Sequence, residues 1–140
     1  MKIVLDTNVL SELMKPQGLI TVKSWVGAQS REDLYITSIT KAEILYGIAI
    51  LPDGKRRDSL RVNAQAMFRE DFARQMLNFD DRAASCFAEI AAHRKKIGKP
   101  LAQADGQIAA ICLANNATIA TRNVDDFLDC QIEIVNPWNP

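Results

Sequence analysis

The chain has 140 residues, of which 48% are hydrophobic, which fits one globular domain with a substantial core. Its 17 basic and 17 acidic side chains cancel, so net charge does not draw the protein to nucleic acid, and any attraction to a polyanion must be local. The three cysteines, Cys86, Cys112 and Cys130, form no Cys-x-x-Cys pair, which argues against a disulfide framework and a zinc knuckle. We therefore expect residues 1–140 to form a single domain with reduced cysteines in packing roles.

The chain also lacks the pattern of an export signal. Its first residues reach the acidic Asp6 after only three apolar side chains, which is not the form of a signal peptide. The most apolar long stretch, residues 101–120, falls short of the roughly 20 apolar residues of a membrane span, because it is interrupted by Gln103, Asp105, Gln107, Asn115 and Asn116. We expect a cytoplasmic protein with no membrane association.

The first half of the chain alternates apolar runs with stretches of helical spacing. A β-branched run at 3–5 predicts a strand, and the capping residues at 6–8 predict a helix directly after it. In chain order we further expect a short helix at about 19–26, a strand at 34–37, a helix from Thr40 to about Ile50, and an amphipathic helix from Lys55 to about Gln75. The start at Thr40 is predicted from the capping-box spacing between Thr40 and Glu43.

The second half continues this alternation. We expect a brief strand at 76–79, a helix capped by Asp80 or Asp81 and ending at Gly98, a helix carrying 104–112, a strand at 118–121, a short helix or turn at 124–128, and a strand at 132–135. Such alternation indicates βαβ units, which build a mostly parallel sheet with helices on both faces. The predicted fold class is a three-layer α/β/α domain. In such domains ligands bind beyond the carboxyl ends of the strands, near a topological switch point.

Three carboxylates fall where this fold would bring them together. Asp6 ends the first strand, Glu43 lies in the first turn after the second strand, and Asp105 lies in the first turn of the helix before the strand at 118–121. Each alone has an ordinary explanation as a helix cap, a capping-box partner or a residue favoured by the helix dipole. Clustered carboxylates repel unless a cation neutralises them, and all-oxygen ligands select Mg²⁺ or Mn²⁺. The sequence therefore predicts an acidic metal site.

Four motifs in succession are similar to those of PIN-domain ribonucleases. They are Ile3–Glu12, Ser38–Ile44 followed by Tyr46-Gly47, Ala104–Ala110 and Ala120–Asn123. Within that family the chain resembles the VapC toxins of type II toxin–antitoxin pairs, especially the FitB-like branch, to which the ending Val135-Asn136-Pro137-Trp138 is also similar. The resemblance covers nearly the whole chain.

The resemblance implies a three-layer PIN-like fold and RNA cleavage. It also implies that Mg²⁺ or Mn²⁺ is held at Asp6 and Asp105, with Glu43 in the same acidic pocket. Its further implications are a homodimer and inhibition by a cognate antitoxin protein, through which the toxin would meet operator DNA only indirectly.

One position departs from the family pattern. Many PIN domains place a fourth acid after the Thr-Arg pair, whereas this chain has Asn123 there, with Asp125 and Asp126 close behind. Asn123 can accept a hydrogen bond or orient a water, and Asp126 can supply the missing charge. Equally, Asn123 can cap the turn before Phe127 while Asp126 lies in solvent. The sequence leaves both interpretations open.

The expected reaction is attack of water on an RNA phosphodiester. One or two Mg²⁺ ions would bind Asp6 and Asp105, with Glu43 positioning the metal or the attacking water. Thr7, Asn8 and Thr121 are expected to support these acids by hydrogen bonds. The RNA cleaved, and the bond cut in it, are not predicted.

Local positive charge is needed to hold RNA. Arg122 is a candidate because it adjoins the predicted site, and further candidates are the run Lys55-Arg56-Arg57 with Arg61 and the run Arg94-Lys95-Lys96 with Lys99. Both runs are equally compatible with ordinary solvated helix faces.

Two other functions are compatible with the sequence. One is a PIN-fold binding module with impaired catalysis, which Asn123 favours. The other is phosphotransfer through Asp6 as a nucleophile. The usual phosphatase pattern needs a second aspartate two residues on, where this chain has Asn8.

Overall fold

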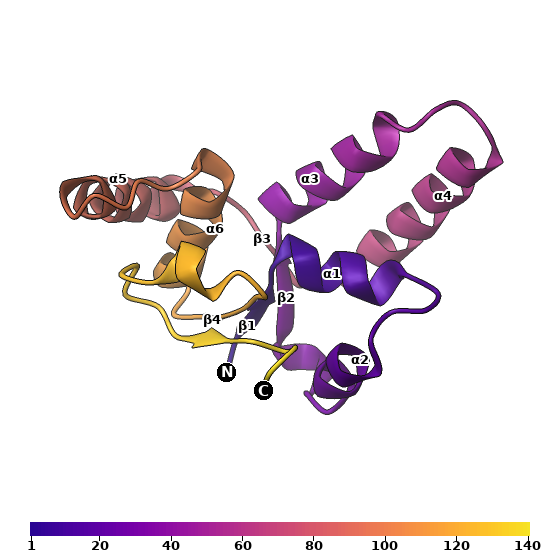
Figure 1. Ribbon diagram of the computed structural model, residues 1–140, viewed down its shortest axis with the longest axis horizontal. Helices are drawn as coiled ribbons and strands as arrows, with labels where there is room; N and C mark the ends of the chain where they lie inside the picture. Colours follow the sequence, from indigo (N-terminus) through magenta and orange to yellow (C-terminus); the bar gives the residue numbers. More distant parts are fainter.

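The computed structural model describes residues 1–140, and a five-stranded sheet lies at its centre (Figure 1). The strands are β1 (Ile3–Leu5), β2 (Leu34–Thr37), β3 (Met76–Leu77), β4 (Thr118–Ala120) and β5 (Ile134–Val135). Their order in the sheet is β3-β2-β1-β4-β5, and every neighbouring pair is parallel. Because the strands are parallel, their carboxyl ends meet at one edge of the sheet.

Helices cover both faces of this sheet. They are α1 (Thr7–Met14), α2 (Ile20–Gly27), α3 (Ser38–Ala49), α4 (Lys55–Glu70), α5 (Asp81–Lys96) and α6 (Gln103–Ala114), with 3₁₀ turns η1 (Arg31–Asp33) and η2 (Val124–Phe127). In Figure 1, α5 and α6 lie on one side of β1 and β2, and α1, α2 and α4 lie on the other. The predicted three-layer α/β/α class is confirmed. None of the helices has the length and apolarity needed to cross a membrane.

Alternation along β1 builds a separate core on each face. Ile3 and Leu5 pack in the cluster formed with α1, α2, α3 and α4, whereas Val4 packs with Ile108 of α6 in the opposite cluster. Side chains of one strand point to opposite faces in turn, so a short strand supplies both cores. Burying an aliphatic side chain of this size stabilises a fold by roughly 1.5–3 kcal/mol, so the apolar run fixes β1 at the centre of the sheet.

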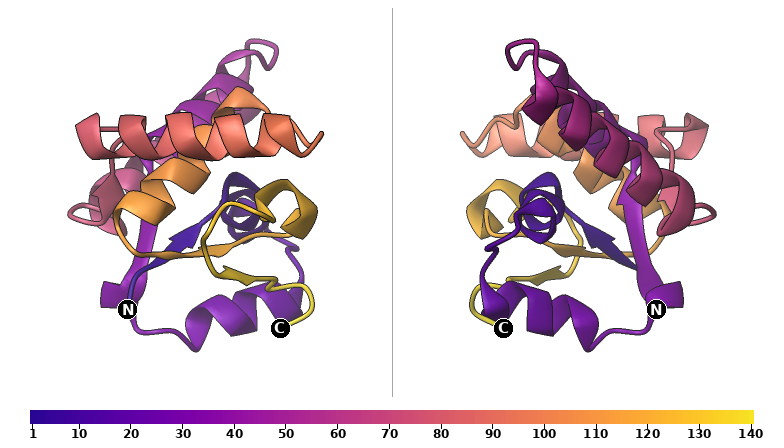
Figure 2. Two further views of the ribbon diagram at one scale, coloured as in Figure 1. Left: turned by 90° about the vertical axis from the view of Figure 1, so that its left-hand side faces the viewer. Right: turned by 90° about the vertical axis from the view of Figure 1, so that its right-hand side faces the viewer.

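The strand order places a switch point beside β1. The chain moves outward from β1 to β2 and β3, then crosses to β4 and β5 on the other side of β1. Asp6 follows β1 and Thr121 follows β4, so these residues flank the switch point at the carboxyl edge. Both termini lie at the end of the molecule near α2, opposite the α3–α4 connection (Figure 2).

Several predicted boundaries differ in the structure, including the end of β3, which was expected at 79 and lies at Leu77. Helix α3 begins at Ser38 and not at Thr40, because Thr37 is the N-cap and its hydroxyl accepts a hydrogen bond from the Thr40 amide at 3.0 Å. Helix α4 ends at Glu70 because the chain must straighten before Gln75, whose carbonyl accepts from the Ile36 amide at 3.0 Å. The last strand is limited to Ile134–Val135. Of the two caps proposed for α5, Asp80 is the one observed.

Candidate functional site

Asp6 lies at the carboxyl end of β1, where it also caps α1. Its side chain is 4% exposed, and one carboxylate oxygen accepts from the Thr7 amide at 2.8 Å while the other accepts from the Thr121 hydroxyl at 2.7 Å. Burial raises the pKa of Asp6 above its usual value, the bonds from Thr121 and Thr7 oppose this rise, and the negative charges of Glu43 and Asp126 add to it. The Asn8 side-chain amide also donates to Asp6 at 3.4 Å, and because a carboxylate has about four acceptor positions, Asp6 retains one for a further ligand.

Thr121 joins the ends of β4 and β1. It is fully buried, and besides donating to Asp6 its hydroxyl oxygen accepts from the Asn123 amide at 3.0 Å and from the Asn8 side-chain amide at 3.4 Å. Asn8 strengthens the same junction, because its side-chain oxygen accepts from the Arg122 amide at 3.3 Å. The supporting residues expected from the sequence therefore contact the site as hydrogen-bond partners.

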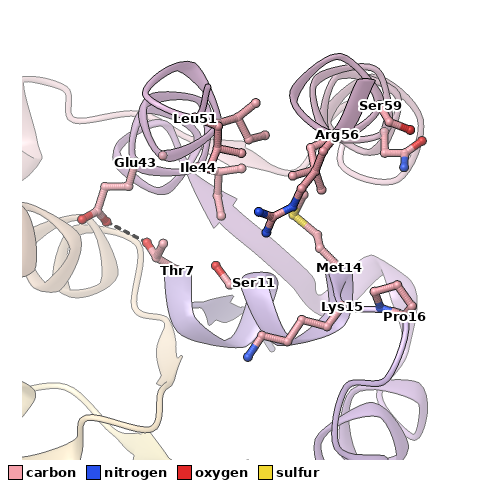
Figure 3. A pocket seen from close by; sticks show the side chains of 14 residues that line it. Thr7, Ser11, Met14, Lys15, Pro16, Glu43, Ile44, Leu51, Arg56 and Ser59 are labelled. Atoms are coloured by element: carbon pink, nitrogen blue, oxygen red, sulfur yellow. Dashed lines mark hydrogen bonds between the residues drawn. The ribbon is translucent and has the colours of Figure 1, made fainter. Parts of the chain in front are cut away.

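Glu43 reaches the same edge from α3. It is exposed, and its carboxylate accepts from the Thr7 hydroxyl at 2.7 Å, as the dashed line in Figure 3 shows. The Thr7 hydroxyl also lies 3.0 Å from that of Thr40, which is fully buried one helical turn before Glu43. Sequence reasoning missed Thr40 as a site residue because its spacing from Glu43 was assigned to a capping box. That same spacing of three places both side chains on one face of α3.

Asp105 lies in the first turn of α6 and is half-buried, and its carboxylate accepts no hydrogen bond. Burial, followed by the charges of Asp6, Asp126 and Glu43, raises its pKa to about 6. Gly106 allows this helix to approach α5 closely, because a Cβ there would lie 2.9 Å from the Phe87 ring. The close packing of α6 on α5 therefore helps to set where Asp105 lies.

Two residues are candidates for the fourth acidic position of the family pattern, Asn123 and Asp126, and only Asp126 is an acid. Asn123 is exposed and stands at the N-cap position of η2, but its side chain makes no capping hydrogen bond. Asp126 is also exposed, and its charge contributes to the raised pKa values of both Asp6 and Asp105, whereas Asp125 contributes to neither. Asp126 therefore adds negative charge near both acids, and its role as the fourth acid stays a proposal.

The carboxylates at this edge fit a divalent cation that keeps several waters better than a cation whose ligands all come from the protein. No group of three or more Asp, Glu, His or Cys side chains is close enough to form a complete ligand set. Mg²⁺ usually keeps several waters and uses one or two carboxylates, so a set of two direct ligands is sufficient. Asp105 has no hydrogen-bond donor and three acidic neighbours, and a cation would relieve their repulsion.

One of the two basic runs differs from the expectation at Arg94. Arg94 is 5% exposed and its guanidinium bonds to main-chain carbonyls, so its assignment to an exposed RNA-binding run is wrong. In the same run, Lys99 pairs with Asp129 at 3.7 Å. Arg122 is exposed, and its guanidinium carbon lies 5.3 Å from the centre of the Trp138 ring, which is a cation–π geometry. Of these three side chains, Arg122 is the one available beside the acidic edge.

A groove of about 740 Å³ runs from the acidic edge between α1, α3 and α4. Thr7 and Glu43 line one end, and Lys15 and Arg56 line its walls further along (Figure 3). Its apolar lining comes from Met14, Ile44, Ile48, Leu51 and Leu60. We refer to this feature as the α1–α3 groove. An apolar lining flanked by basic side chains suits a polypeptide segment with apolar and acidic residues.

Comparison with known proteins gives consistent results. The PIN domain family model matches residues 3–130. The chain is 42% identical to the plasmid stability protein StbB of Pseudomonas syringae pv. tomato over 97% of this chain and 98% of that protein. It is 40% identical to the VapC ribonuclease Y4jK of Sinorhizobium fredii over 99% of both chains. Among solved structures, FitAcB from Neisseria gonorrhoeae matches with a TM-score of 0.93 and 37% identity, over 99% of each chain.

Proposed function

Because the chain belongs to the PIN-domain family, in its VapC and FitB-like branch, we propose that it is a Mg²⁺-dependent endoribonuclease acting as the toxin of a type II toxin–antitoxin pair. The observation that carries this proposal is the coupling of acids at the carboxyl edge. There burial and three neighbouring carboxylates raise the pKa of Asp105 to about 6. Such a pocket attracts a divalent cation, and Mn²⁺ is an acceptable substitute for Mg²⁺.

Each site residue then has a defined task. Asp6 and Asp105 hold the cation, which when bound would lower the pKa of water and offset charge on the phosphoryl oxygens. Glu43, oriented by the Thr7 hydroxyl, positions the attacking water and accepts its proton. Thr121 keeps Asp6 in its rotamer by donating to it at 2.7 Å. Arg122 contacts a phosphate of the RNA.

The proposed partner is a cognate antitoxin in the cytoplasm. The solved structures similar to this chain include FitAB bound to a DNA fragment, with a TM-score of 0.92 and 37% identity. We propose that an antitoxin segment lies in the α1–α3 groove, where it would contact Thr7 and Glu43 at the groove's end. In this arrangement the toxin is a homodimer, and operator DNA is bound by the antitoxin.

The test is cleavage of total RNA by the purified chain. We expect fragments with Mg²⁺ or Mn²⁺ and none with a chelator, and the Asp6→Asn and Asp105→Asn proteins should be inactive while keeping the same circular dichroism spectrum. Cleavage that survives the chelator, or that survives either substitution, would contradict the proposal.

A binding module without catalysis is the second candidate function. It is favoured by Asn123 at the position of the fourth family acid. The same experiment separates the two, because a binding module would retain RNA in a gel-shift assay without cutting it at any concentration of Mg²⁺ or Mn²⁺.

A further inference from the structure

Thr40 buries a hydroxyl in the first turn of α3 that does not serve as the cap of this helix. The residue is fully buried, and the N-cap of α3 is Thr37, whose hydroxyl accepts from the Thr40 amide at 3.0 Å. The only hydrogen-bond partner of the Thr40 hydroxyl is the hydroxyl of Thr7, 3.0 Å away at the start of α1. A buried hydroxyl costs free energy unless it is bonded, and valine would fill the same space. The contact with Thr7 is therefore what the Thr40 hydroxyl provides.

The number of protons on these hydroxyls fixes the direction of their hydrogen bonds. Thr7 has one hydroxyl proton, which it donates to the Glu43 carboxylate at 2.7 Å, and Figure 3 shows these two side chains pointing toward one another. In the 3.0 Å contact with Thr40, the Thr7 oxygen can then only accept, so the Thr40 hydroxyl is the donor. The chain of bonds runs from the fully buried Thr40 through the half-buried Thr7 to the exposed Glu43.

This chain restricts a carboxylate that has little else to hold it. Thr7 is the one group of the protein that donates to the Glu43 carboxylate, and a hydroxyl group by itself rotates freely about its C–O bond. Because Thr40 donates to the Thr7 oxygen, the Thr7 proton is turned away from Thr40 and toward Glu43. Hydrogen bonds in a chain also polarise one another, which strengthens the last bond.

We propose that Thr40 is a positioning residue of the reaction, whose buried hydroxyl donates to Thr7 and thereby restricts the Glu43 carboxylate to the orientation that holds the attacking water. The inference rests on the proposed function, because it takes from it the task of Glu43. Thr40 acts through Thr7 and not by touching the reacting atoms.

The first test compares Thr40→Val, which keeps the shape of threonine without its hydroxyl, with Thr40→Ser, which keeps the hydroxyl. We expect kcat for RNA cleavage to fall about tenfold in Thr40→Val, because a displaced water attacks poorly, and to be restored in Thr40→Ser. KM should stay within about twofold, since the bonds to the RNA are unchanged. Thr40→Ala should show the same loss and replaces Thr40→Val if that chain does not fold.

Thr118→Val is the matched control for loss of a threonine hydroxyl. Thr118 lies at the start of β4, away from the carboxyl edge of the sheet, and its hydroxyl donates to Glu133 at 3.5 Å. Its kcat and KM should equal those of the unmodified chain. Circular dichroism at the assay temperature shows that every protein compared is folded.

The second test needs neither RNA nor metal. In isotope-labelled protein, the three-bond couplings of the Glu43 Cγ to its own backbone nitrogen and carbonyl carbon report by NMR whether the side chain keeps one χ1 rotamer. We expect a single rotamer in the unmodified chain, in Thr40→Ser and in Thr118→Val. Couplings averaged over several rotamers are expected in Thr40→Val and in Thr7→Val.

A double substitution tests whether Thr40 acts through Thr7. In a chain that already carries Thr7→Val, the further change Thr40→Val should lower the remaining kcat by less than about twofold. If Thr40 instead affected the packing of α3 in general, the two losses would multiply.

The outcomes separate this inference from the proposed function. If the unmodified chain cleaves RNA, then an equal kcat in Thr40→Val, the same loss in Thr40→Ser, or a single Glu43 rotamer in Thr40→Val would overturn the inference and leave the proposed function standing. Losses that multiply in the double substitution would overturn it as well. If the unmodified chain cleaves no RNA with Mg²⁺ or Mn²⁺, the proposed function fails and this inference fails with it.

Discussion

The two ends of the acidic site are built in opposite ways. At the end of β1, Asp6 is buried and both carboxylate oxygens accept hydrogen bonds, from the Thr7 amide and the Thr121 hydroxyl. At η2, Asp126 is exposed, its carboxylate accepts none, and the segment is held from behind by Arg94. The first acid is fixed through its side chain and the second through its main chain.

This difference explains why the Asp6 end of the site follows a sequence motif and the η2 end, with Asp126, departs from it. An acid fixed by side-chain hydrogen bonds needs its neighbours at set positions, so Asp6-Thr7-Asn8 and Thr121 must occur together. A segment held by its carbonyls accepts any side chain at the bonded positions, because carbonyls belong to every residue. The charge can therefore lie at Asp126 while Asn123 occupies the motif position.

The largest effect is expected from substitution of the buried Asp6. Asp6→Asn removes a proposed direct ligand of the cation, so we expect RNA cleavage to fall by about 100-fold or more. The same substitution should increase the free energy of unfolding without metal, because burial raises the pKa of Asp6 and its ionised form therefore destabilises the folded state at pH 7. Urea unfolding in a chelator measures this. Lower stability together with lost cleavage would show that Asp6 serves the fold.

Substitutions in the exposed turn η2 should have smaller effects on Mg²⁺ binding, and the size of the effect should depend on which residue is changed. We expect Asp126→Asn to weaken Mg²⁺ binding about tenfold, as loss of one supporting charge at a metal site does. Asp125→Asn is the control, because it removes an equal charge from the same turn without acting on Asp6 or Asp105. Asn123→Ala should change affinity by less than about twofold. A larger effect for Asn123→Ala than for Asp126→Asn would reverse the assignment of the fourth position.

The pH dependence of Mg²⁺ binding tests the interaction of Asp105 with the neighbouring carboxylates. The pKa of Asp105 is raised to about 6, so this carboxyl group is mostly ionised at pH 7 and mostly protonated at pH 5. Because a cation requires the ionised form, affinity should fall about tenfold between pH 7 and pH 5. Without metal the sign is opposite, since a raised pKa in the folded state makes stability increase as the pH falls from 7 towards 5. Asp105→Asn should reduce both dependences.

A more modest loss is expected at the junction of β1 and β4. Thr121→Val keeps the shape of a fully buried side chain but removes the hydroxyl that bonds to Asp6, Asn8 and Asn123. We expect the free energy of unfolding to fall by about 1–2 kcal/mol, because buried polar groups lose a partner. Cleavage should fall about fivefold, since the Asp6 rotamer is less restricted. Equal stability by urea unfolding would show that water replaces the hydroxyl.

The smallest effect is expected at Trp138, which stacks on Arg122. Trp138→Leu should free the Arg122 guanidinium and weaken RNA binding about threefold, as loss of an exposed cation–π contact does. Binding is measured in the inactive Asp6→Asn background, and Trp138→Phe is the control that keeps an aromatic ring. If Arg122→Ala and Trp138→Leu together weaken binding by the product of their separate effects, the two residues act independently.

How much the sequence could predict depends on how far apart along the chain the interacting residues lie. Strand and helix periods are local, so the three-layer fold followed from apolar spacing. The places of Asp6, Glu43 and Asp105 next to predicted strands and helix starts made them site candidates, and motif resemblance then indicated their chemistry. Arg94 was assigned to a basic run because the sequence shows its charge but not its burial, which depends on carbonyls more than 30 residues away. Thr40 was assigned to a helix start for a similar reason, since its contact with Thr7 joins two different helices.

The most direct test of the metal site is a crystal structure of the chain grown with Mn²⁺ and measured for anomalous scattering. We expect one strong peak at the carboxyl edge of the sheet, with oxygen atoms of Asp6 and Asp105 at bonding distance, about 2.0–2.2 Å, and with waters completing the shell. A peak bound elsewhere, or no peak at a Mn²⁺ concentration that supports RNA cleavage, would contradict it.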